Sequence, residues 1–159
     1  MIYSYELEKQ LLAGLLKDPE SLTEISNFIG TSDFYSESTS LNSTIFRIIE
    51  QAITANDEID EIIIAQRVNE IGLSFEDNVN PSDYIKSLAL RKVPAGNILK
   101  TAKELKKYSI RREILKSSNA IAKRMKAISA ESSYQDIIDA ADSIYNLSLI
   151  HISEPTRPY

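Results

Sequence analysis

One segment, residues 97–127, limits the folds that this chain can adopt. It has the pattern of a single long helix and carries ten Lys and Arg residues against two Glu residues, a formal charge of +8. The whole chain of 159 residues has a formal charge of −5. A helix of about 30 residues is ~45 Å long, which is longer than a helix that only packs against one side of a small hydrophobic core. The segment therefore predicts a basic helical arm on a smaller body.

Composition narrows the possible function classes. The length predicts one domain with a real hydrophobic core. The chain has no cysteine, so disulfides and thiolate metal sites are excluded. Its first residues lack the features of a signal peptide, and no apolar run approaches the ~20 residues that span a bilayer. We therefore expect a cytoplasmic protein with no membrane partner.

The C-terminal residues 147–159 stand apart from this reasoning. Leu147–Arg157 resembles the translation of a sequencing-library adapter over 11 consecutive residues. We expect the natural chain to end near Asn146 and to be truncated there. The only histidine, His151, lies in this tail. The natural part then lacks both His and Cys, which excludes most nucleophile–base and zinc chemistries.

Helix signals dominate residues 1–96. Ser4 precedes a leucine stripe that starts at Leu7, and Asp18-Pro19 ends that helix and begins another, with Gly30 as its expected C′ residue. Apolar residues from Leu41 to Ile53 predict a third helix. Asp60 and Gly72 bound a fourth, and Asn80-Pro81 opens a fifth. The three consecutive isoleucines Ile62–Ile64 are also compatible with a β-strand, but the cap Asp60 and the terminal Gly72 favour a helix.

The residues after Val93-Pro94-Ala95-Gly96 predict a hairpin. Residues 1–96 have a formal charge of −9, residues 97–127 of +8 and residues 128–146 of −4. Ser133, with Asp136 three residues later, has the spacing of a capping box that opens a last helix. We therefore predict an all-α fold, with a small orthogonal helical bundle over 1–96 and a long helical hairpin over 97–146.

The long helix changes its apolar face along its length. Ile98, Ala102 and Leu105 lie on one side, and the later apolar residues lie nearly opposite. The first face can hold the body while the second meets a partner. The residues that we expect to mediate self-association or the docking of a partner are Ile114, Ser118, Ile121, Met125, Tyr134, Ile138, Ala141 and Tyr145.

No catalytic, cofactor-binding or metal-binding residues are predicted. The four glycines are isolated, and nothing fits the phosphate-binding pattern G-x-x-x-x-G-K-[ST]. The carboxylates of Asp57, Glu58, Asp60 and Glu61 are explained by a solvated turn and a helix cap.

The basic helix leaves three interpretations open. It could bind nucleic-acid phosphates, although only Tyr108 is interleaved for base stacking and the whole chain is acidic. It could be a solvated face partly neutralised by the acidic last helix. It could also support association through the apolar side of the hairpin. The residues of the nucleic-acid alternative are Lys103, Lys106, Lys107, Arg111 and Arg112.

Several landmarks follow one another along the chain. They are Glu8–Leu16, Asp33-Phe34-Tyr35, Ile45-Phe46, Glu58-Ile59-Asp60, Tyr84, Leu88, Pro94, Asn97 and Arg112. In this order they resemble the N-terminal domain of DnaB-type replicative DNA helicases of bacteria and their phages, whose opening stretch E-x-x-x-L-G-x-L-L is matched by Glu8–Leu16 with its glycine shifted by one. Asn42 stands where the family usually has a histidine, the spacing from Tyr35 to Ile45 is longer than usual, and Val79-Asn80-Pro81 replaces a Gly-Gly pair.

The resemblance implies a function that composition does not reveal. In this family the N-terminal domain pairs through its hairpin, builds a collar on a hexameric ring and docks primase. The ATP- and Mg²⁺-dependent motor, which also meets DNA, follows a linker. The whole family protein is an ATP-dependent DNA helicase, whereas this chain is expected to be non-catalytic by itself and to hold no cofactor.

Overall fold

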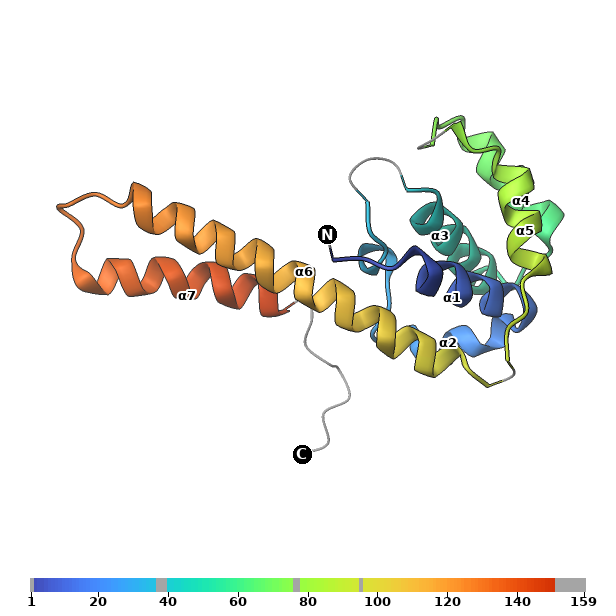
Figure 1. Ribbon diagram of the computed structural model, residues 1–159, viewed down its shortest axis with the longest axis horizontal. Coiled ribbons are helices and arrows are strands. Elements are labelled where there is room, and N and C mark those ends of the chain that lie inside the picture. Colours follow the sequence, from blue (N-terminus) through green and yellow to red (C-terminus); the bar gives the residue numbers. More distant parts are fainter. Residues whose placement is uncertain (1, 37–39, 76–77, 95, 151–159) are drawn as a thin grey trace. The chain divides into compact units, whose positions relative to one another are not determined.

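The computed structural model describes residues 2–36, 40–75, 78–94 and 96–150, apart from the side chains of 146–150. Within these ranges every regular element is a helix, so the all-α prediction is confirmed (Figure 1). In chain order the elements are α1 (Tyr5–Lys17), η1 (Pro19–Ser21), α2 (Leu22–Ile25), η2 (Thr31–Asp33), α3 (Leu41–Thr54), α4 (Glu61–Ile71), α5 (Pro81–Leu90), α6 (Ile98–Ala127) and α7 (Tyr134–Ile150).

The chain divides into two compact units, and the division falls inside α6. The first unit, here called the body, is Tyr3–Ser109, and the second, the hairpin unit, holds Ile2 and the residues from Ile110 onward. The sequence places its boundary at 96/97, where the charge changes sign. The compact units divide later because the first turns of α6 belong to the core of the body.

The core of the body is formed by facing helices. α1 packs against α3 and α5, and α4 packs against the same two helices. Leucines and isoleucines at helical spacing supply the buried side chains, as the sequence pattern predicts. The largest fully buried side chains are Leu11, Leu12, Leu15, Ile25, Ile45, Phe46, Ile49, Ile64, Ile85, Leu88 and Leu105.

A glycine permits the close approach of α1 to the start of α6. A Cβ atom on Gly14 would lie 2.8 Å from Ile98 Cγ1 and 3.1 Å from Ile98 Cδ1. A Cβ contact of 2.8 Å is essentially never seen and one of 3.1 Å is unusually tight, and Ile98 is itself buried. The missing side chain at position 14 therefore leaves the space that Ile98 fills.

The predicted helix ends are confirmed at four places. The Ser4 hydroxyl accepts a hydrogen bond from the Leu7 amide, and the Asp60 carboxylate accepts one from the Ile62 amide. The Asn80 side chain caps α5 ahead of its first-turn proline. Gly72 ends α4 with φ of 70°, in the left-handed region that glycine adopts without steric cost.

The prediction for Gly30 is wrong. Its φ of −139° and ψ of −178° are extended, so it is not the left-handed C′ residue of a helix. The helix before it is also shorter than expected, since only η1 and the one-turn α2 form. The physical reason is Asp33, whose carboxylate accepts a hydrogen bond from the Gly30 amide at 2.8 Å and makes Gly30 the N-cap of η2.

The hairpin unit consists of the rest of α6, the connection 128–133 and α7 (Figure 1). The predicted capping box is present. The Ser133 hydroxyl accepts from the Asp136 amide at 3.1 Å, and the Asp136 carboxylate accepts from the Ser133 amide at 3.3 Å. Residues 147–150 of the expected adapter-derived tail continue α7. Residues 151–159, with His151, lie outside the described residues.

Candidate functional site

Motif residues from three helices and a loop meet in one buried hydrogen-bond network. Glu8, on α1, has no solvent-exposed surface. Its Oε1 accepts a hydrogen bond from Asn42 Nδ2 at 3.0 Å, and its Oε2 accepts one from the Tyr35 amide at 3.1 Å. The hydroxyl of Tyr84, on α5, donates to Asn42 Oδ1. The network joins α1, α3 and α5, so these motif residues hold the fold together.

The chemistry of Asn42 explains how it can replace the usual histidine. Its amide donates to Glu8 and accepts from Tyr84. A neutral imidazole also offers one donor and one acceptor. Asn42 and a neutral histidine therefore offer the same kinds of hydrogen-bond partner to the buried carboxylate and to the Tyr84 hydroxyl.

A second buried network fixes α6 to the body. Asp33 is 4% exposed, and besides Gly30 its carboxylate accepts hydrogen bonds from Ser109 Oγ at 2.5 Å and Lys106 Nζ at 3.0 Å. Ser109 is the last residue of the body. Asp33 therefore binds α6 at the point where its packing in the body ends.

The structure divides the basic residues that were candidates for nucleic-acid binding. Lys106 forms the ion pair with Asp33, and Lys107 pairs with Glu104 at 2.9 Å. Arg112 donates from Nη1 to the Ile2 carbonyl at 2.9 Å. Lys103 and Arg111 are exposed. The five residues thus do not form one set of free cations, and their role with DNA stays a prediction.

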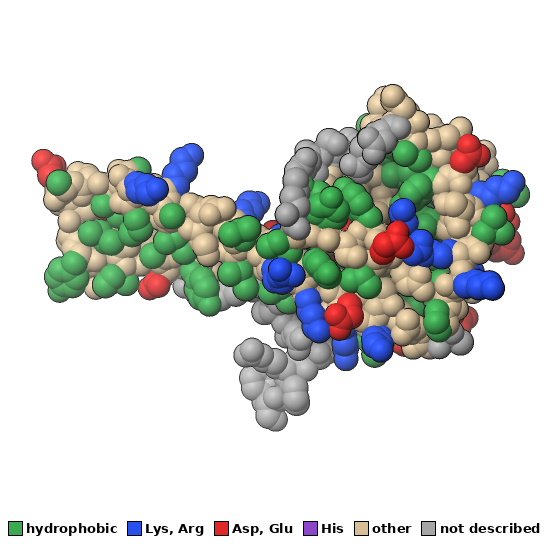
Figure 2. All heavy atoms as spheres, viewed as in Figure 1, with side chains coloured by type: hydrophobic (Ala, Val, Ile, Leu, Met, Phe, Trp, Pro, Cys, Tyr) green, Lys and Arg blue, Asp and Glu red, His purple; other side chains and the backbone are tan. Residues whose placement is uncertain are grey.

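The hairpin unit presents apolar side chains to solvent. Tyr134 is 80% exposed and Ile114 is 46% exposed. Among the described residues from 110 to 145, no apolar side chain is buried. Figure 2 shows hydrophobic side chains gathered along both helices of this unit. Of the remaining candidates, Ile138, Tyr145 and Ser118 are exposed, and Ile121, Met125 and Ala141 are half-buried.

Leu115 joins this surface although the sequence pattern did not select it. It is half-exposed, at 50%, directly after Ile114. Residues three or four apart lie on the same face of a helix, so a search for one such stripe that includes Ile114 does not select its neighbour Leu115. The signal that could have found it is the pair of neighbouring large apolar residues in a segment that is otherwise rich in charge.

Ion pairs do not support the interpretation that the acidic residues of α7 neutralise the basic residues of α6. Within the described part, no ion pair joins Lys116, Lys123, Arg124 or Lys126 to any carboxylate. In water, exposed pairs of this kind contribute at most about 1 kcal/mol, so their absence has little effect on stability. These cations remain available to a partner.

The acidic turn before α4 has a structural role. Arg67 forms an ion pair with Asp57 at 2.9 Å, and Asp60 caps the helix. Among the described residues no cluster of three potential ligands could hold a metal ion, and no helix is both long and apolar enough to cross a membrane.

Comparison with known proteins places the chain in a family. The model of the DnaB-like helicase N terminal domain matches residues 1–107. The chain belongs to this family. No curated protein matches the sequence. The crystal structure of the N-terminal domain of DnaB helicase from Mycobacterium tuberculosis has a similar fold, with a TM-score of 0.76 at 16% identity, over 91% of this chain and 98% of that one.

The family match covers nearly all residues of the two buried networks. Glu8, Asp33, Asn42, Tyr84 and Lys106 lie within the matched residues 1–107, and Ser109 lies just beyond them. Most of the hairpin unit lies beyond that range. The family pattern is therefore carried mainly by residues that build the body.

Proposed function

We propose that this DnaB-like domain is the collar-forming N-terminal domain of a replicative DNA helicase. It pairs through its hairpin within a hexamer and docks primase. The proposal assigns no ATPase to this chain, because its sequence has no phosphate-binding loop. ATP, Mg²⁺ and DNA act in the motor domain of the whole helicase.

The apolar surface of the hairpin unit is the observation that carries the proposal. Large apolar residues that are 46–80% exposed lie on both helices, and no apolar side chain is buried between residues 110 and 145 in the described structure. Each Å² of apolar surface removed from water contributes about 25 cal/mol. A second hairpin laid on this surface would supply the burial that a single chain lacks.

A charge placed on this surface tests the pairing. Ile114→Glu should weaken self-association by roughly 100-fold or more, because burying an unpaired charge costs about 3–5 kcal/mol. Sedimentation equilibrium measures this change. Ile71→Glu, in the body and 39% exposed, is the matched control and should leave association unchanged. Equal association of the two variants would remove the hairpin as the interface.

Primase docking is the second part of the proposal. Tyr134 is 80% exposed, the highest fraction of any aromatic side chain in the described part of the hairpin unit, and aromatic residues are frequent anchors at interfaces. Calorimetry with the primase of the same replication system should show binding that Tyr134→Ser weakens by about tenfold. Undiminished binding by that variant would exclude Tyr134 as an anchor.

Direct DNA binding is the alternative. It is favoured by Lys103 and the exposed cations farther along α6, and it is weakened by the ion pairs of Lys106 and Lys107. It predicts affinity for a labelled oligonucleotide that falls steeply with salt. No change in fluorescence anisotropy at low salt would exclude it.

A further inference from the structure

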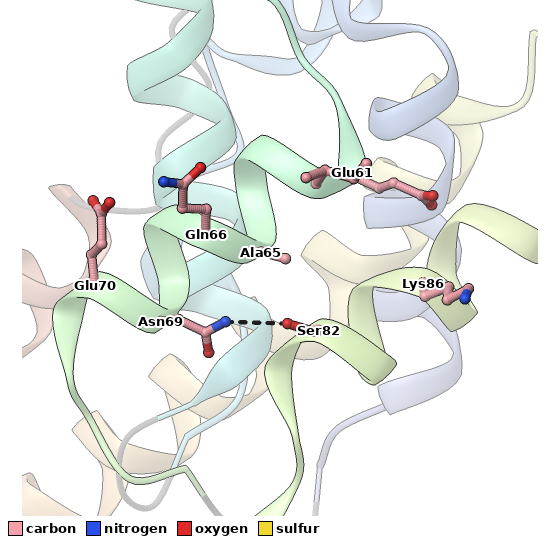
Figure 3. Close-up of a pocket in the computed structure, with 8 residues that line it drawn as sticks. Glu61, Ala65, Gln66, Asn69, Glu70, Ser82 and Lys86 are labelled. Carbon is pink, nitrogen blue, oxygen red and sulfur yellow. Dashed lines mark hydrogen bonds between the residues drawn. The ribbon is translucent and has the colours of Figure 1, made fainter.

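A groove between α4 and α5 belongs to neither the hairpin nor the buried networks. Its volume is about 810 Å³, and it lies wholly within the body (Figure 3). At one end the Asn69 side chain donates to Ser82 Oγ at 3.1 Å, which ties the two helices together. The groove is lined by Glu61, Ile62, Ala65, Gln66, Asn69 and Glu70 of α4 and by Ser82 and Lys86 of α5.

Part of the groove's surface is apolar and exposed to solvent. Ile62 is 71% exposed, and Ala65 lies buried beneath the same face of α4. Ile62, Gln66 and Asn69 have the spacing of one helical stripe. Among the described residues of the body, four of the five exposed large apolar side chains lie on α4, on α5 or directly after α4. They are Ile62, Ile71, Leu73 and Leu90.

Charged side chains without ion pairs flank this surface. Glu61 and Glu70 lie toward opposite ends of the groove, and Lys86 lies on the α5 side (Figure 3). Within the described part of the chain none of the three forms an ion pair, whereas nearby Asp57 is already paired with Arg67. The groove thus offers two carboxylates and one ammonium group around an apolar side chain.

We propose that this groove docks an amphipathic helix of a partner protein. An apolar side chain of that helix packs on Ile62, its cations meet Glu61 and Glu70, and an acidic residue meets Lys86. A helix laid in the groove between two helices is a common recognition mode. The charges of the groove favour a protein helix over a nucleic acid, since the carboxylates of Glu61 and Glu70 would repel phosphates.

A labelled peptide tests the site. The probe is a fluorescein-labelled amphipathic helix of Leu, Ala and Lys with one Glu, about 18 residues long, so that it spans the ~16 Å of α4. The comparison peptide has Glu in place of every Lys. The Lys peptide should bind the full chain and shift the ¹⁵N resonances of α4 and α5. Ile62→Ser and the double change Glu61→Lys, Glu70→Lys should each weaken binding by about tenfold or more.

Controls separate this site from the hairpin. Ile62 and both glutamates are exposed, so circular dichroism should show the variants folded. Tyr134→Ser and Ile114→Glu remove exposed apolar surface outside the groove and should leave peptide affinity unchanged. Equal affinity of the groove variants, or equal binding of the Glu peptide, would overturn the proposal. Loss of self-association in Ile62→Ser would assign the groove to a second copy of the chain and would also overturn it.

Discussion

Lys106 Nζ lies 3.0 Å from Asp33 Oδ1, although 73 residues separate the two in the sequence. The Lys106 side chain is 16% exposed and that of Asp33 is 5% exposed. The sequence alone gives Lys106 the look of an exposed cation of the basic helix. In the structure it forms a largely buried ion pair with Asp33. The pair fastens α6 to the loop that carries the D-F-Y motif.

Removing the lysine should destabilise the body. Lys106→Met leaves a buried carboxylate without its cation, and we expect a loss of roughly 2–3 kcal/mol. That is below the usual cost of breaking a buried pair, because Ser109 and Gly30 still donate to Asp33. Urea denaturation measures the loss. Lys107→Met breaks the exposed pair with Glu104 and should cost no more than about 0.5 kcal/mol. Equal losses would contradict a special role for Asp33.

The buried network around Glu8 predicts a specific requirement at position 42. Asn42→Leu removes a donor to Glu8 and an acceptor for Tyr84, and should cost about 2–4 kcal/mol because both partners are left unsatisfied. Asn42→His restores a donor and an acceptor and should recover at least half of this loss. Asn27→Leu, at an exposed position, should change stability by no more than about 0.5 kcal/mol. A loss for the histidine variant as large as for leucine would contradict this account.

The contact between Gly14 and Ile98 predicts a steric limit. Gly14→Val places a branched side chain where even one carbon would lie 2.8 Å from Ile98, and should cost about 3 kcal/mol. Gly30→Ala is the control, because nothing lies within 4 Å of its added Cβ and its backbone is extended. Thermal unfolding of both variants provides the measurement. A neutral Gly14→Val variant would show that α6 does not need this approach.

The link between Glu6 and Arg91 predicts a pH dependence. A hydrogen bond from Arg91, and its charge, lower the pKa of Glu6 from its ordinary 4.5. A carboxyl group with a lowered pKa stabilises the fold above its unfolded pKa and loses this effect as the pH falls through its folded pKa. The melting temperature of Glu6→Gln should therefore lie below that of the unmodified chain near about pH 7 and converge with it in acid.

Arg91 provides the control for that prediction. In an Arg91→Met background, the pH-dependent effect of Glu6→Gln should be much smaller, since the main cause of the lowered pKa is gone and only the weaker attraction of Lys9 remains. A pH-dependent difference of undiminished size in this background would assign the effect to another group.

Local signals predicted most of the fold. Caps such as Ser4, Asp60 and Asn80 act within three residues of themselves, so the sequence displays both partners. The prediction for Gly30 failed although its partner Asp33 is also near, because glycine is compatible with both a helix end and an extended cap. Residue type alone does not distinguish these two backbone conformations.

The candidate sites were less accessible to sequence reasoning because they depend on distant partners. Nothing near Lys106 in the sequence reveals Asp33, and nothing near Glu8 reveals Asn42. The groove is lined by residues of both α4 and α5, so the apolar periodicity of either helix alone does not predict it. Helical periodicity did select Ile114 and Ile138 as apolar positions of the hairpin, and the structure leaves both exposed. A contact that covers Ile114 and Ile138 would come from a second molecule, and the sequence of one chain does not display such a contact.

Crosslinking through an introduced cysteine tests the central claim most directly. The chain has no cysteine, so Ser118→Cys provides one reactive position on the proposed pairing surface, and Ser26→Cys provides an exposed control in the body. With a short bis-maleimide, Ser118→Cys should yield a covalent dimer and Ser26→Cys should not. A Ser118→Cys variant that sediments as a dimer yet crosslinks no better than Ser26→Cys, or a chain that stays monomeric at high concentration, would contradict assembly through the hairpin.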